Sequence, residues 1–364
     1  MSRPTRATID LSAFRYNLQH ARKLASASKL LAVVKANGYG HGILNAAQGL
    51  KQADGYAVAC LEEARQLREA GYSHTILLLE GVFQHQELAA VNQLSLEIVV
   101  HNSRQIEWLE NTTLQSPIRV WLKIDSGMHR LGIQANQFDE FYLRLQACVN
   151  VDNTIVLMTH LASADDRQNS ATEQQLNDFQ SIIEGIDAPE SIANSAALIS
   201  LPDTHKTWAR PGIMLYGASP FASSRDWHDD LKPVMTLRSQ LIAIKNCQSG
   251  DKVGYSGSWT CPEDMSVGVV AIGYGDGYPR HANSDTPVLI NGVTTRLLGR
   301  VSMDMITVDL RTVSDAAVGD EVILWGEGLP VELVAESLGT ISYELLCQVT
   351  QRVPMDVIES MAST

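Results

Sequence analysis

A single lysine between an apolar run and a glycine-rich segment is the most chemically suggestive feature of this 364-residue chain. Five apolar residues, Leu30 to Val34, precede Lys35, and glycines follow at positions 38, 40 and 42. Such a run is typical of a strand buried on both faces, which brings its last side chain to the rim of a sheet. A desolvated amine there loses its proton more readily and can form an imine with an aldehyde or ketone. Lys35 could equally be a strand-end lysine whose charged tip reaches solvent, and the spacing alone does not choose between these interpretations.

Further polar and charged side chains occur near the ends of later apolar runs. The stretches concerned are Lys123-Ile-Asp-Ser-Gly-Met-His-Arg130, Met158-Thr-His160, Asn194-Ser195 and Arg210-Pro-Gly-Ile213. If the runs are parallel strands of a barrel, these groups gather at the same rim as Lys35. This recurrence indicates one composite site more strongly than any single residue does.

The elements that would position these groups are short apolar runs alternating with amphipathic stretches, as far as about residue 217. Stretches such as Leu61–Ala70, Asn102–Glu110 and Thr172–Ile183 carry apolar residues at three- and four-residue steps, which predicts helices. Eight strand–helix alternations favour a (β/α)8 barrel, although an open doubly wound sheet has the same periodicity. The predicted strands are Leu30–Lys35, Tyr56–Cys60, Thr75–Leu79, Leu96–Val100, Ile118–Ile124, Ile155–His160, Ser191–Asn194 and Ile213–Tyr216, of which the seventh is the least regular.

The composition changes after residue 217. The segment 217–224 is rich in turn-forming residues and predicts a connector. Beyond it, apolar runs separated by turns predict a mostly β domain, and Asn291-Gly292 is a strong hairpin signal. We therefore expect an N-terminal (β/α)8 barrel over residues 1–231, with residues 1–11 able to pack against the second domain, and a mostly β domain over residues 232–364. The elements expected there are strands at Leu241–Ile244, Ser266–Ile272, Val288–Ile290, Met305–Leu310 and Glu321–Leu324, and helices at Val331–Leu338 and Tyr343–Val349.

The overall composition narrows the class of protein. Apolar residues make up 45% and charged residues 19%, which suits a globular chain with a sizeable core. A net charge of −13 argues against a nucleic-acid partner, because binding a phosphate backbone requires a positive surface. Five cysteines without a framework spacing are typical of free thiols in a reducing compartment, and no apolar run reaches transmembrane length. We expect a cytoplasmic protein with no membrane or nucleic-acid partner.

The segment Val34-Lys35-Ala36-Asn37-Gly38-Tyr39-Gly40-His41-Gly42 resembles the cofactor-binding signature of the alanine racemases, and later stretches resemble the same family in order over nearly the whole chain. The resemblance implies that Lys35 holds pyridoxal 5′-phosphate (PLP) as an imine. The implied reaction is the interconversion of L-alanine and D-alanine, which supplies D-alanine for peptidoglycan or degrades it.

The resemblance also assigns the groups around the cofactor. Arg210 matches the arginine that faces the ring nitrogen of PLP, and His160 matches the histidine that holds this arginine in place. A fixed cation cannot accept the proton of that nitrogen, so the cofactor is a weaker electron sink and racemisation is favoured; related barrel decarboxylases use an acidic residue there. Without the resemblance, Ser195 would be interpreted as a helix cap and Tyr343 as a packed aromatic residue. The groups implied to bind the phosphate are Tyr39, Ser195, Tyr343 and the backbone amides of Gly212 and Ile213.

Racemisation needs a base on each face of the α-carbon, because the planar carbon must be reprotonated on the face opposite to the one that lost the proton. Lys35 can serve one face only. Gly254-Tyr255-Ser-Gly-Ser-Trp259 resembles the family motif that carries the second base, which makes Tyr255 the other catalytic residue; in such a loop a tyrosine is otherwise more often a turn aromatic. A phenol titrates near 10, so this role requires cationic neighbours that lower its pKa. In the family, this tyrosine and Met303 complete the site of the other subunit, which implies a head-to-tail homodimer.

Further matches imply contacts with the substrate. Arg130 matches the group that touches Tyr255 or the substrate carboxylate. Met303 and Asp304 match the substrate-binding stretch, in which the Met303 amide receives that carboxylate. Lys123 matches a lysine that is often carbamylated and then orients Arg130; an ion pair with a carboxylate such as Asp125 is the alternative. Residues expected along the access corridor are Arg280, Arg300 and Ile341, and no metal is implied.

Three other classes of function remain as alternatives. A broad-specificity amino-acid racemase or a decarboxylase could use the same architecture and cofactor. A non-catalytic PLP-binding protein would share the barrel and the lysine, but such proteins lack the β domain that carries Tyr255, so the predicted C-terminal domain argues against it. A metal-dependent hydrolase is disfavoured because His41, His160 and the acidic residues show no ligand spacing.

Overall fold

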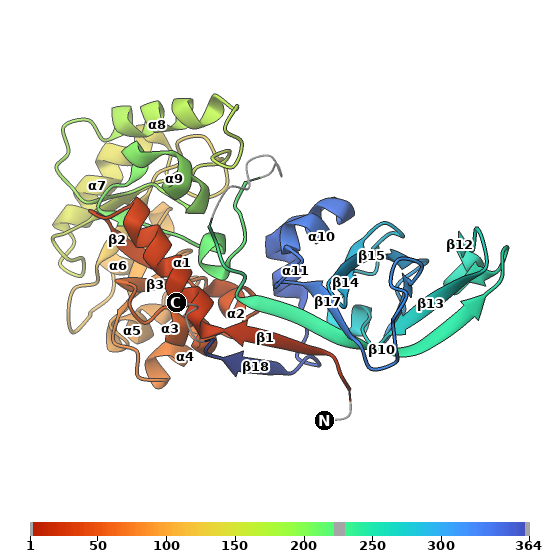
Figure 1. The fold of residues 1–364 in the computed structure, drawn as a ribbon. Helices are drawn as coiled ribbons and strands as arrows, with labels where there is room; N and C mark the ends of the chain where they lie inside the picture. The colour runs from red at the N-terminus through yellow and green to blue at the C-terminus, as the bar shows by residue number, and fades with distance from the viewer. Residues whose placement is uncertain (1–2, 222–229, 361–364) are drawn as a thin grey trace.

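The computed structural model describes residues 3–221 and 230–360 of the chain. It consists of a parallel barrel covered by helices and an elongated, mostly β part that extends from one side of the barrel (Figure 1). Strand β10 (Met235–Cys247) runs from the junction along the second part. Strand β1 (Arg6–Asp10) pairs with β10, and β18 (Met355–Ile358) pairs with β1, so segments near both ends of the chain meet at this junction.

Within the described residues, eight parallel strands close the barrel, and this confirms the predicted (β/α)8 architecture. Neighbours in the barrel follow chain order, and the last strand pairs with the first. The strands are β2 (Lys29–Val33), β3 (Gly55–Val58), β4 (Thr75–Leu78), β5 (Glu97–Val100), β6 (Val120–Lys123), β7 (Val156–Met158), β8 (Glu190–Ser191) and β9 (Trp208–Ala209). The helical segments of this part are α1 (Leu11–Leu24), α2 (Lys35–Tyr39), α3 (Ile43–Gly49), α4 (Leu61–Glu69), α5 (Glu87–Gln93), α6 (Ser103–Glu110), α7 (Phe138–Ala147), α8 (Ala171–Ile182) and α9 (Ser195–Ser200).

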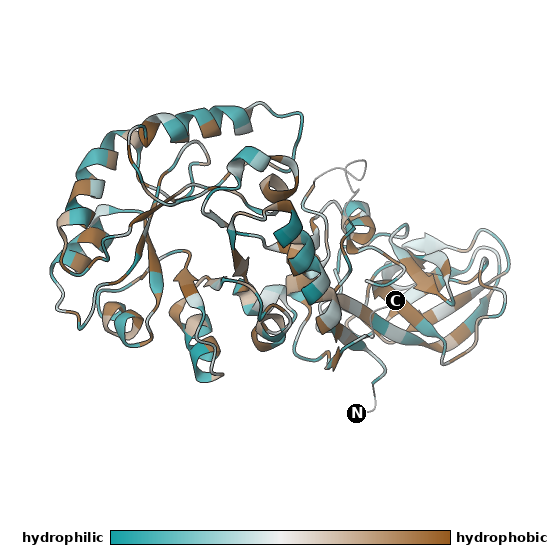
Figure 2. Cartoon of the chain, turned by 60° about the vertical axis from the view of Figure 1, so that its left-hand side comes forward, coloured by the Kyte–Doolittle hydropathy of each residue, from teal (hydrophilic) through white to brown (hydrophobic). Residues whose placement is uncertain are grey.

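The barrel forms because its strands carry apolar residues on both faces, and each surrounding helix carries an apolar face that packs against them. Every residue of β3, β5 and β6 is buried. In α4 the buried side chains are Ala64 and Leu67, three residues apart, so one face of the helix packs inward. Figure 2 shows apolar residues along the barrel strands and mixed polar and apolar residues along the surrounding helices.

The predicted eighth strand, Ile213–Tyr216, is wrong. These residues form a 3-10 helix, η3, and the strand is β9, which ends at Ala209. All four residues of η3 are buried, and a short buried apolar run looks the same in the sequence whether it is a strand or a helix. Pro211 separates the two elements, since a proline has no N–H to continue a strand ladder.

The second part is a sheet with the strand order β13-β16-β15-β14-β17-β10-β1-β18, in which β10 also pairs with β13 and every pairing except that of β1 with β18 is antiparallel. The predicted Asn291-Gly292 hairpin joins β14 to β15, and both of its residues have positive φ (50° and 76°). The remaining elements are β11 (Lys252–Val253), β12 (Trp259–Thr260), β13 (Met265–Val270), β14 (Pro287–Ile290), β15 (Val293–Leu298), β16 (Ile306–Asp309), β17 (Glu321–Trp325), α10 (Val331–Leu338) and α11 (Ser342–Gln348).

Strand β1 lies in the sheet of the second part, antiparallel to β10 and parallel to β18. The predicted domain boundary between residues 231 and 232 stays a prediction, and the predicted connector 217–224 lies outside the described residues from 222 onward. In the described ranges, no helix combines the length and the apolar character needed to cross a membrane.

Candidate active site

A cavity of about 540 Å³ lies at the rim where the carboxyl ends of the barrel strands meet. This volume is within the range of roughly 300–1,000 Å³ that small-molecule sites occupy. The cavity brings together most of the side chains that the sequence singled out. The predicted residues that line it are Lys35, Tyr39, Lys123, Arg130, His160, Ser195, Arg210, Gly212, Ile213 and Tyr343.

The backbone directly after Lys35 forms a left-handed turn. The segment α2 has positive φ at Ala36 (53°), Asn37 (53°), Gly38 (62°) and Tyr39 (48°). For residues with a Cβ this conformation costs about 1–2 kcal/mol each, and such strain concentrates at functional sites. The Asn37 side chain offsets part of the cost by accepting a hydrogen bond of 2.9 Å from the amide of the residue six positions later.

The His41 side chain stabilises the same turn through hydrogen bonds to its backbone. Its buried ring places Nδ1 at 2.9 Å from the carbonyl oxygen of Tyr39 and 3.1 Å from that of Gly38. Because both partners are acceptors, Nδ1 carries the proton and donates. Burial lowers the pKa of His41 to about 4, so the ring is neutral at physiological pH. The role of His41 is therefore to hold the backbone turn that follows Lys35.

Arg210 is a buried cation held by oxygen acceptors. Its Nη1 donates to Ser191 Oγ at 2.6 Å, and its Nη2 donates to the carbonyl groups of Thr159 (2.6 Å) and Ile192 (3.2 Å). Burial lowers the pKa of Arg210 to about 10, so the guanidinium stays charged at neutral pH. Its hydrogen-bond partners among the described residues are hydroxyl, carbonyl and imidazole groups rather than carboxylates.

His160 is the imidazole partner of Arg210. Its Nδ1 lies 3.4 Å from Nη2 of Arg210, close to the limit for a hydrogen bond. Burial, the charge of Arg210 and further cations lower the pKa of His160 well below its usual range. The ring is therefore neutral and can accept the Arg210 proton at Nδ1. The structure thus brings together the pair that the sequence predicted.

Lys123 is a second lysine in the cavity. It is the last residue of β6 and is buried. Burial, together with the charges of Arg210, Arg130 and Lys35, lowers the pKa of Lys123 to about 8. About a tenth of this amine is therefore neutral at pH 7 and about half at pH 8, and the neutral form can act as a nucleophile.

Asp125 binds groups other than the Lys123 amine. Its carboxylate accepts hydrogen bonds from the amides of Gly127 (3.1 Å) and His129 (3.0 Å). It also lies 3.4 Å from Nδ1 of the His129 ring. These contacts disfavour the interpretation of Lys123 as a simple ion-pair partner of Asp125.

Ser195 and its neighbour Asn194 have separate roles at the start of α9. The Asn194 side chain caps the helix by accepting a hydrogen bond of 3.0 Å from the amide of Ala197. The Ser195 hydroxyl instead accepts from the amides of Gly212 (2.8 Å) and Met214 (3.4 Å). The capping interpretation of Ser195 is therefore wrong, and its hydroxyl lies beside residues 212–214, of which Gly212 and Ile213 line the cavity.

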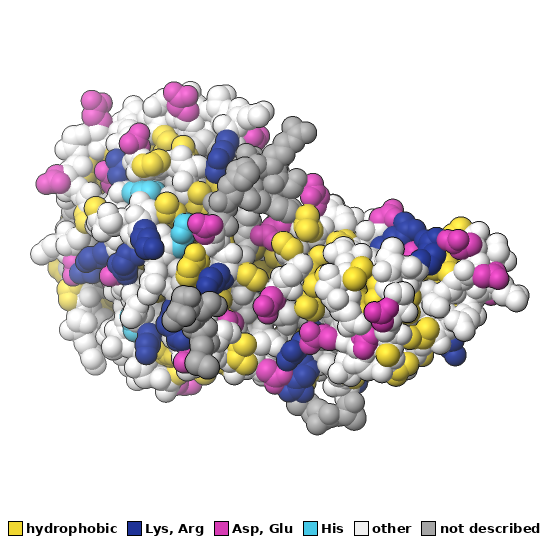
Figure 3. All heavy atoms as spheres, viewed as in Figure 1, with side chains coloured by type: hydrophobic (Ala, Val, Ile, Leu, Met, Phe, Trp, Pro, Cys, Tyr) yellow, Lys and Arg dark blue, Asp and Glu magenta, His cyan; other side chains and the backbone are white. Residues whose placement is uncertain are grey.

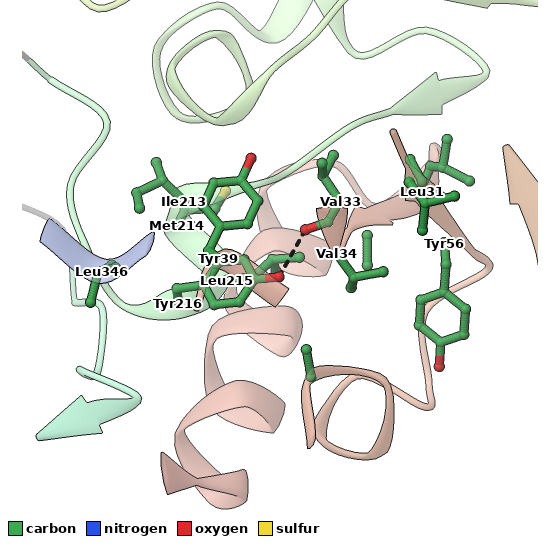
Figure 4. Close-up of a cluster of buried hydrophobic side chains, with 14 of the residues drawn as sticks. Leu31, Val33, Val34, Tyr39, Tyr56, Ile213, Met214, Leu215, Tyr216 and Leu346 are labelled. Atoms are coloured by element: carbon green, nitrogen blue, oxygen red, sulfur yellow. Dashed lines mark hydrogen bonds between the residues drawn. The ribbon is translucent and has the colours of Figure 1, made fainter. Parts of the chain in front are cut away.

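Aromatic residues close this end of the cavity. Tyr39 stacks on Tyr216 with ring centroids 4.5 Å apart, and the Tyr216 hydroxyl donates to the carbonyl of Val33 at 2.9 Å (Figure 4). The ring of Tyr343 lies 5.9 Å from that of Tyr39. A Cβ at Gly212 would fall 2.7 Å from the Tyr39 hydroxyl, so a side chain at this position would displace the Tyr39 ring. This end of the cavity thus brings together the phenol groups of Tyr39 and Tyr343, the Ser195 hydroxyl and the backbone of Gly212.

This set of groups fits PLP. The cavity offers Lys35 for an aldehyde, the Arg210 cation for a ring nitrogen, and hydroxyl and amide donors for a phosphate. The close approach required at Gly212 is also what a ligand bound through backbone amides needs.

Tyr255 and Met303 do not line this cavity. Tyr255 lies in the turn between β11 and β12, and its side chain is 67% exposed. Met303, on the β part, is 53% exposed. Figure 3 shows several hydrophobic side chains on one face of that part. The predicted second base is therefore on the surface of this chain, outside the cavity that Lys35 lines.

Asp304 is also outside the cavity and is engaged in ion pairs. Its carboxylate lies 2.7 Å from Arg352 and 3.4 Å from Arg3. Both arginines also contact the buried carboxylate of Asp276, at 3.4 Å and 2.7 Å respectively. This network anchors the segment that carries Met303, and a direct contact of Asp304 with substrate stays a prediction.

The sequence analysis missed some lining residues. Leu79 and Glu80 directly follow β4, so the strand-end rule could have found them. Cys347 lies one helical turn after Tyr343 on α11, and the i, i+4 spacing was the available signal. Over residues 3–221 and 230–360, no three His, Cys, Asp or Glu side chains are placed to hold a metal ion.

Known proteins resemble this chain in sequence and in fold. The family model for the alanine racemase N-terminal domain matches residues 9–220, and that for the alanine racemase C-terminal domain matches residues 234–357. An alanine racemase of Coxiella burnetii is 48% identical over 364 residues, which covers 99% of this chain and 100% of that protein. One of Nitrosococcus oceani is 52% identical over 351 residues, covering 96% and 98%. The crystal structure of the biosynthetic alanine racemase from Pseudomonas aeruginosa superposes with a TM-score of 0.94 at 45% identity, covering 98% of this chain and 100% of that one.

Proposed function

The chain belongs to the alanine racemase family, and we propose that it interconverts L-alanine and D-alanine with PLP as its cofactor. The observation that carries this proposal is the presence of Lys35 and the buried guanidinium of Arg210 in one cavity. An amine that can hold the cofactor and a cation that limits its electron withdrawal are the two features that favour racemisation over decarboxylation.

PLP, when bound, supplies an aldehyde that condenses with amines and a ring that withdraws electrons from the substrate α-carbon. Lys35 is the amine that holds the cofactor. Arg210 would face the ring nitrogen with a positive charge, because its acceptors fix the guanidinium and a pKa of about 10 keeps it charged at neutral pH. The groups that would hold the phosphate are Ser195, Tyr39, Tyr343 and the amides of Gly212 and Ile213.

Two bases divide the proton transfers. Lys35 Nζ takes or returns the α-proton on one face of the substrate, and the Tyr255 hydroxyl of a second copy does so on the other. The exposure of Tyr255 supports this division, because the residue is free to enter the cavity of another chain. A head-to-tail homodimer follows, in which each chain supplies one base to each site.

Charged groups at the cavity mouth bind the substrate carboxylate and tune Tyr255. Arg130 contributes a cation near the phenol or the carboxylate, and the Met303 amide and Asp304 come from the second copy. The neutral Lys123 amine adds to CO₂ and loses a proton, which gives a carbamate anion that orients Arg130. The lowered pKa of Lys123 supports this modification.

The reaction supplies D-alanine for peptidoglycan or removes it. The five cysteines are free thiols, which supports a reducing compartment such as the cytoplasm.

The test uses purified protein loaded with PLP and given L-alanine or D-alanine separately. Each enantiomer should be converted to the same equimolar mixture, measured by chiral chromatography, and Lys35→Ala should convert neither. Carbon dioxide release in place of inversion would assign a decarboxylase. Faster inversion of serine or of larger amino acids would assign a broad-specificity racemase.

A further inference from the structure

Two cysteines outside the candidate active site lie at the base of the hairpin that carries Tyr255. Cys247 is the last residue of β10, and Cys261 directly follows β12. Between them β11 pairs with β12, and Tyr255 occupies the connecting turn. We call residues 247–261 the Tyr255 hairpin. The two cysteines are the points where this hairpin joins the rest of the β part.

Backbone hydrogen bonds hold the two sides of this base together. The amide of Gly250 donates to the carbonyl of Cys261 at 2.9 Å, and the amide of Cys261 donates to the carbonyl of Asp251 at 2.8 Å. Cys247 packs against the small apolar cluster that includes Cys261, and the neighbouring Cys247 thiol contributes to the raised pKa of Cys261. The other members of this cluster are Val253, Trp259, Met265, Val267 and Leu298.

The two thiols differ in accessibility. Cys261 is 2% exposed, and burial raises the pKa of its thiol. Cys247 is partly exposed and lines an open surface cavity of about 850 Å³. A small reagent can therefore reach Cys247 first, while Cys261 is held behind it. An accessible thiol beside a resolving thiol is the arrangement found at redox-responsive sites.

We propose that Cys247 and Cys261 are a redox modification site that forms a reversible disulfide across the base of the Tyr255 hairpin. The oxidant is a low-molecular-weight disulfide such as glutathione disulfide. The Cys247 thiolate attacks one of its sulfurs, forms a mixed disulfide and releases one glutathione thiolate. Cys261 gives up its proton and attacks the Cys247 sulfur, which releases the second glutathione. Two protein thiols are oxidised to one disulfide, and one glutathione disulfide is reduced to two thiols.

The disulfide changes the geometry of the hairpin. An S–S bond is about 2.0 Å long, shorter than the van der Waals contact of two unbonded sulfur atoms, so the two sides of the base must move together. This movement tilts the turn that carries Tyr255, and a misplacement of about 1 Å can lower a catalytic rate by roughly 10²-fold. The effect on rate rests on the proposed function, in which Tyr255 is a base. The formation of the disulfide does not depend on that function.

Peptide mapping tests the disulfide directly. Trypsin cleaves after Lys245, Lys252 and Arg280, so Cys247 and Cys261 fall in different peptides. After treatment of the PLP-loaded protein with glutathione disulfide, these two peptides should be recovered as one cross-linked species that dithiothreitol separates. Cys148→Ser should still give the cross-link, and Cys247→Ser should not. The exposed Cys347 reports whether the reagent was effective. Glutathione on Cys347 without the cross-link overturns the proposal.

Racemisation rates test the consequence. Oxidised protein with Cys247 intact should be at least about fivefold slower than Cys247→Ser treated in the same way, and dithiothreitol should restore it. Both proteins carry Cys347→Ser for this measurement, because glutathione on a residue that lines the cavity would slow both of them, and the difference then isolates the disulfide. Equal rates despite a confirmed cross-link would overturn the coupling to Tyr255. Absence of racemisation in all samples would count against the proposed function and leave the mapping result valid.

Discussion

Nη2 of Arg210 donates a hydrogen bond of 2.6 Å to the carbonyl oxygen of Thr159, the residue directly before His160. This bond joins the end of β9 to the end of β7, across the intervening strand β8. The guanidinium is therefore fixed by the barrel itself, and His160 is only one of its partners. Removing Arg210 should disturb the barrel rim as well as any chemistry at that position.

Arg210→Gln should lower the free energy of unfolding by about 2–4 kcal/mol, because buried acceptors on Ser191, Thr159 and Ile192 lose their charged donor. Urea denaturation followed by circular dichroism measures the loss. The control is Arg238→Gln, which breaks a partly exposed ion pair of 3.0 Å with Glu321 and should cost no more than about 1 kcal/mol. Equal losses in the two variants would contradict the anchoring role of Arg210.

His41 should make the protein less stable in mild acid. Its pKa is lowered from 6.5 to about 4 in the folded protein. As pH falls below about 6.5 the unfolded chain binds a proton that the folded protein still excludes, so stability is full above that pH and declines toward pH 4. The slope is about 1.4 kcal/mol per pH unit for one proton.

A pair of histidine variants tests this slope. His41→Asn keeps a donor near the position of Nδ1 but cannot be protonated. Between pH 6.5 and about 4.5 the unfolding free energy of this variant should therefore fall less steeply than that of the wild type, by the slope that one bound proton contributes. His281→Asn, at an exposed position, is the control and should keep the wild-type slope. The idea fails if His41→Asn has the same slope as the wild type.

Much of the site could be predicted because of one geometric rule. Parallel strands place their carboxyl ends at one rim, so Lys35, Lys123 and His160 could be expected to meet from their strand-end positions alone. The left-handed turn after Lys35 could not be predicted in this way, because nothing in the local sequence requires Ala36 and Asn37 to leave the right-handed conformation. That turn depends on contacts that form only on folding, such as the bond from the Ile43 amide to the Asn37 side chain.

The failed strand at Ile213–Tyr216 has a similar cause. Its apolar run is buried in either conformation, and Tyr216 is fixed by long-range contacts with Val33 and Tyr39 that the local pattern does not contain. The exposure of Tyr255 was likewise not readable from periodicity. Only the resemblance to a family pointed to a base shared between subunits.

Lys35, rather than Lys123, should carry the cofactor. Both lysines line the cavity, so their labelling discriminates between two real candidates. Borohydride reduction of the PLP-loaded protein followed by peptide mapping should place the pyridoxyl group on Lys35 alone. Lys35→Ala should take up no label and should not exchange the α-hydrogen of either alanine enantiomer. A label on Lys123 in the wild-type protein would refute the assignment.

Lys123 should bind carbon dioxide. With a pKa of about 8, roughly half of the amine is neutral at pH 8, and the carbamate should increase as pH rises from about 7 to 9. Protein equilibrated with ¹³C-bicarbonate should show one carbamate signal by NMR. Lys123→Met should lack it, whereas Lys206→Met, at a partly exposed lysine 3.8 Å from Glu190, should keep it. A signal that persists in Lys123→Met would assign the modification elsewhere.

Tyr255→Phe should separate the two proton transfers. The substitution keeps the ring but removes the hydroxyl, and Tyr255 lies outside the cavity of its own chain, so PLP binding should be unchanged. Net racemisation should fall by about 10² to 10⁴-fold, the usual contribution of a general base.

Exchange of the α-hydrogen with solvent deuterium, followed by NMR for each enantiomer separately, shows which face has lost its base. If Lys35 serves the D-enantiomer and Tyr255 the L-enantiomer, exchange from D-alanine should survive better in Tyr255→Phe, because Lys35 is still present. Tyr274→Phe, another exposed tyrosine of the β part, is the comparison and should exchange both enantiomers with similar rates. Equal loss from both enantiomers in Tyr255→Phe, with PLP still bound, would argue against a division of labour between the two bases. Full racemisation by that variant would remove Tyr255 from the mechanism and leave its exposed hairpin without a catalytic role.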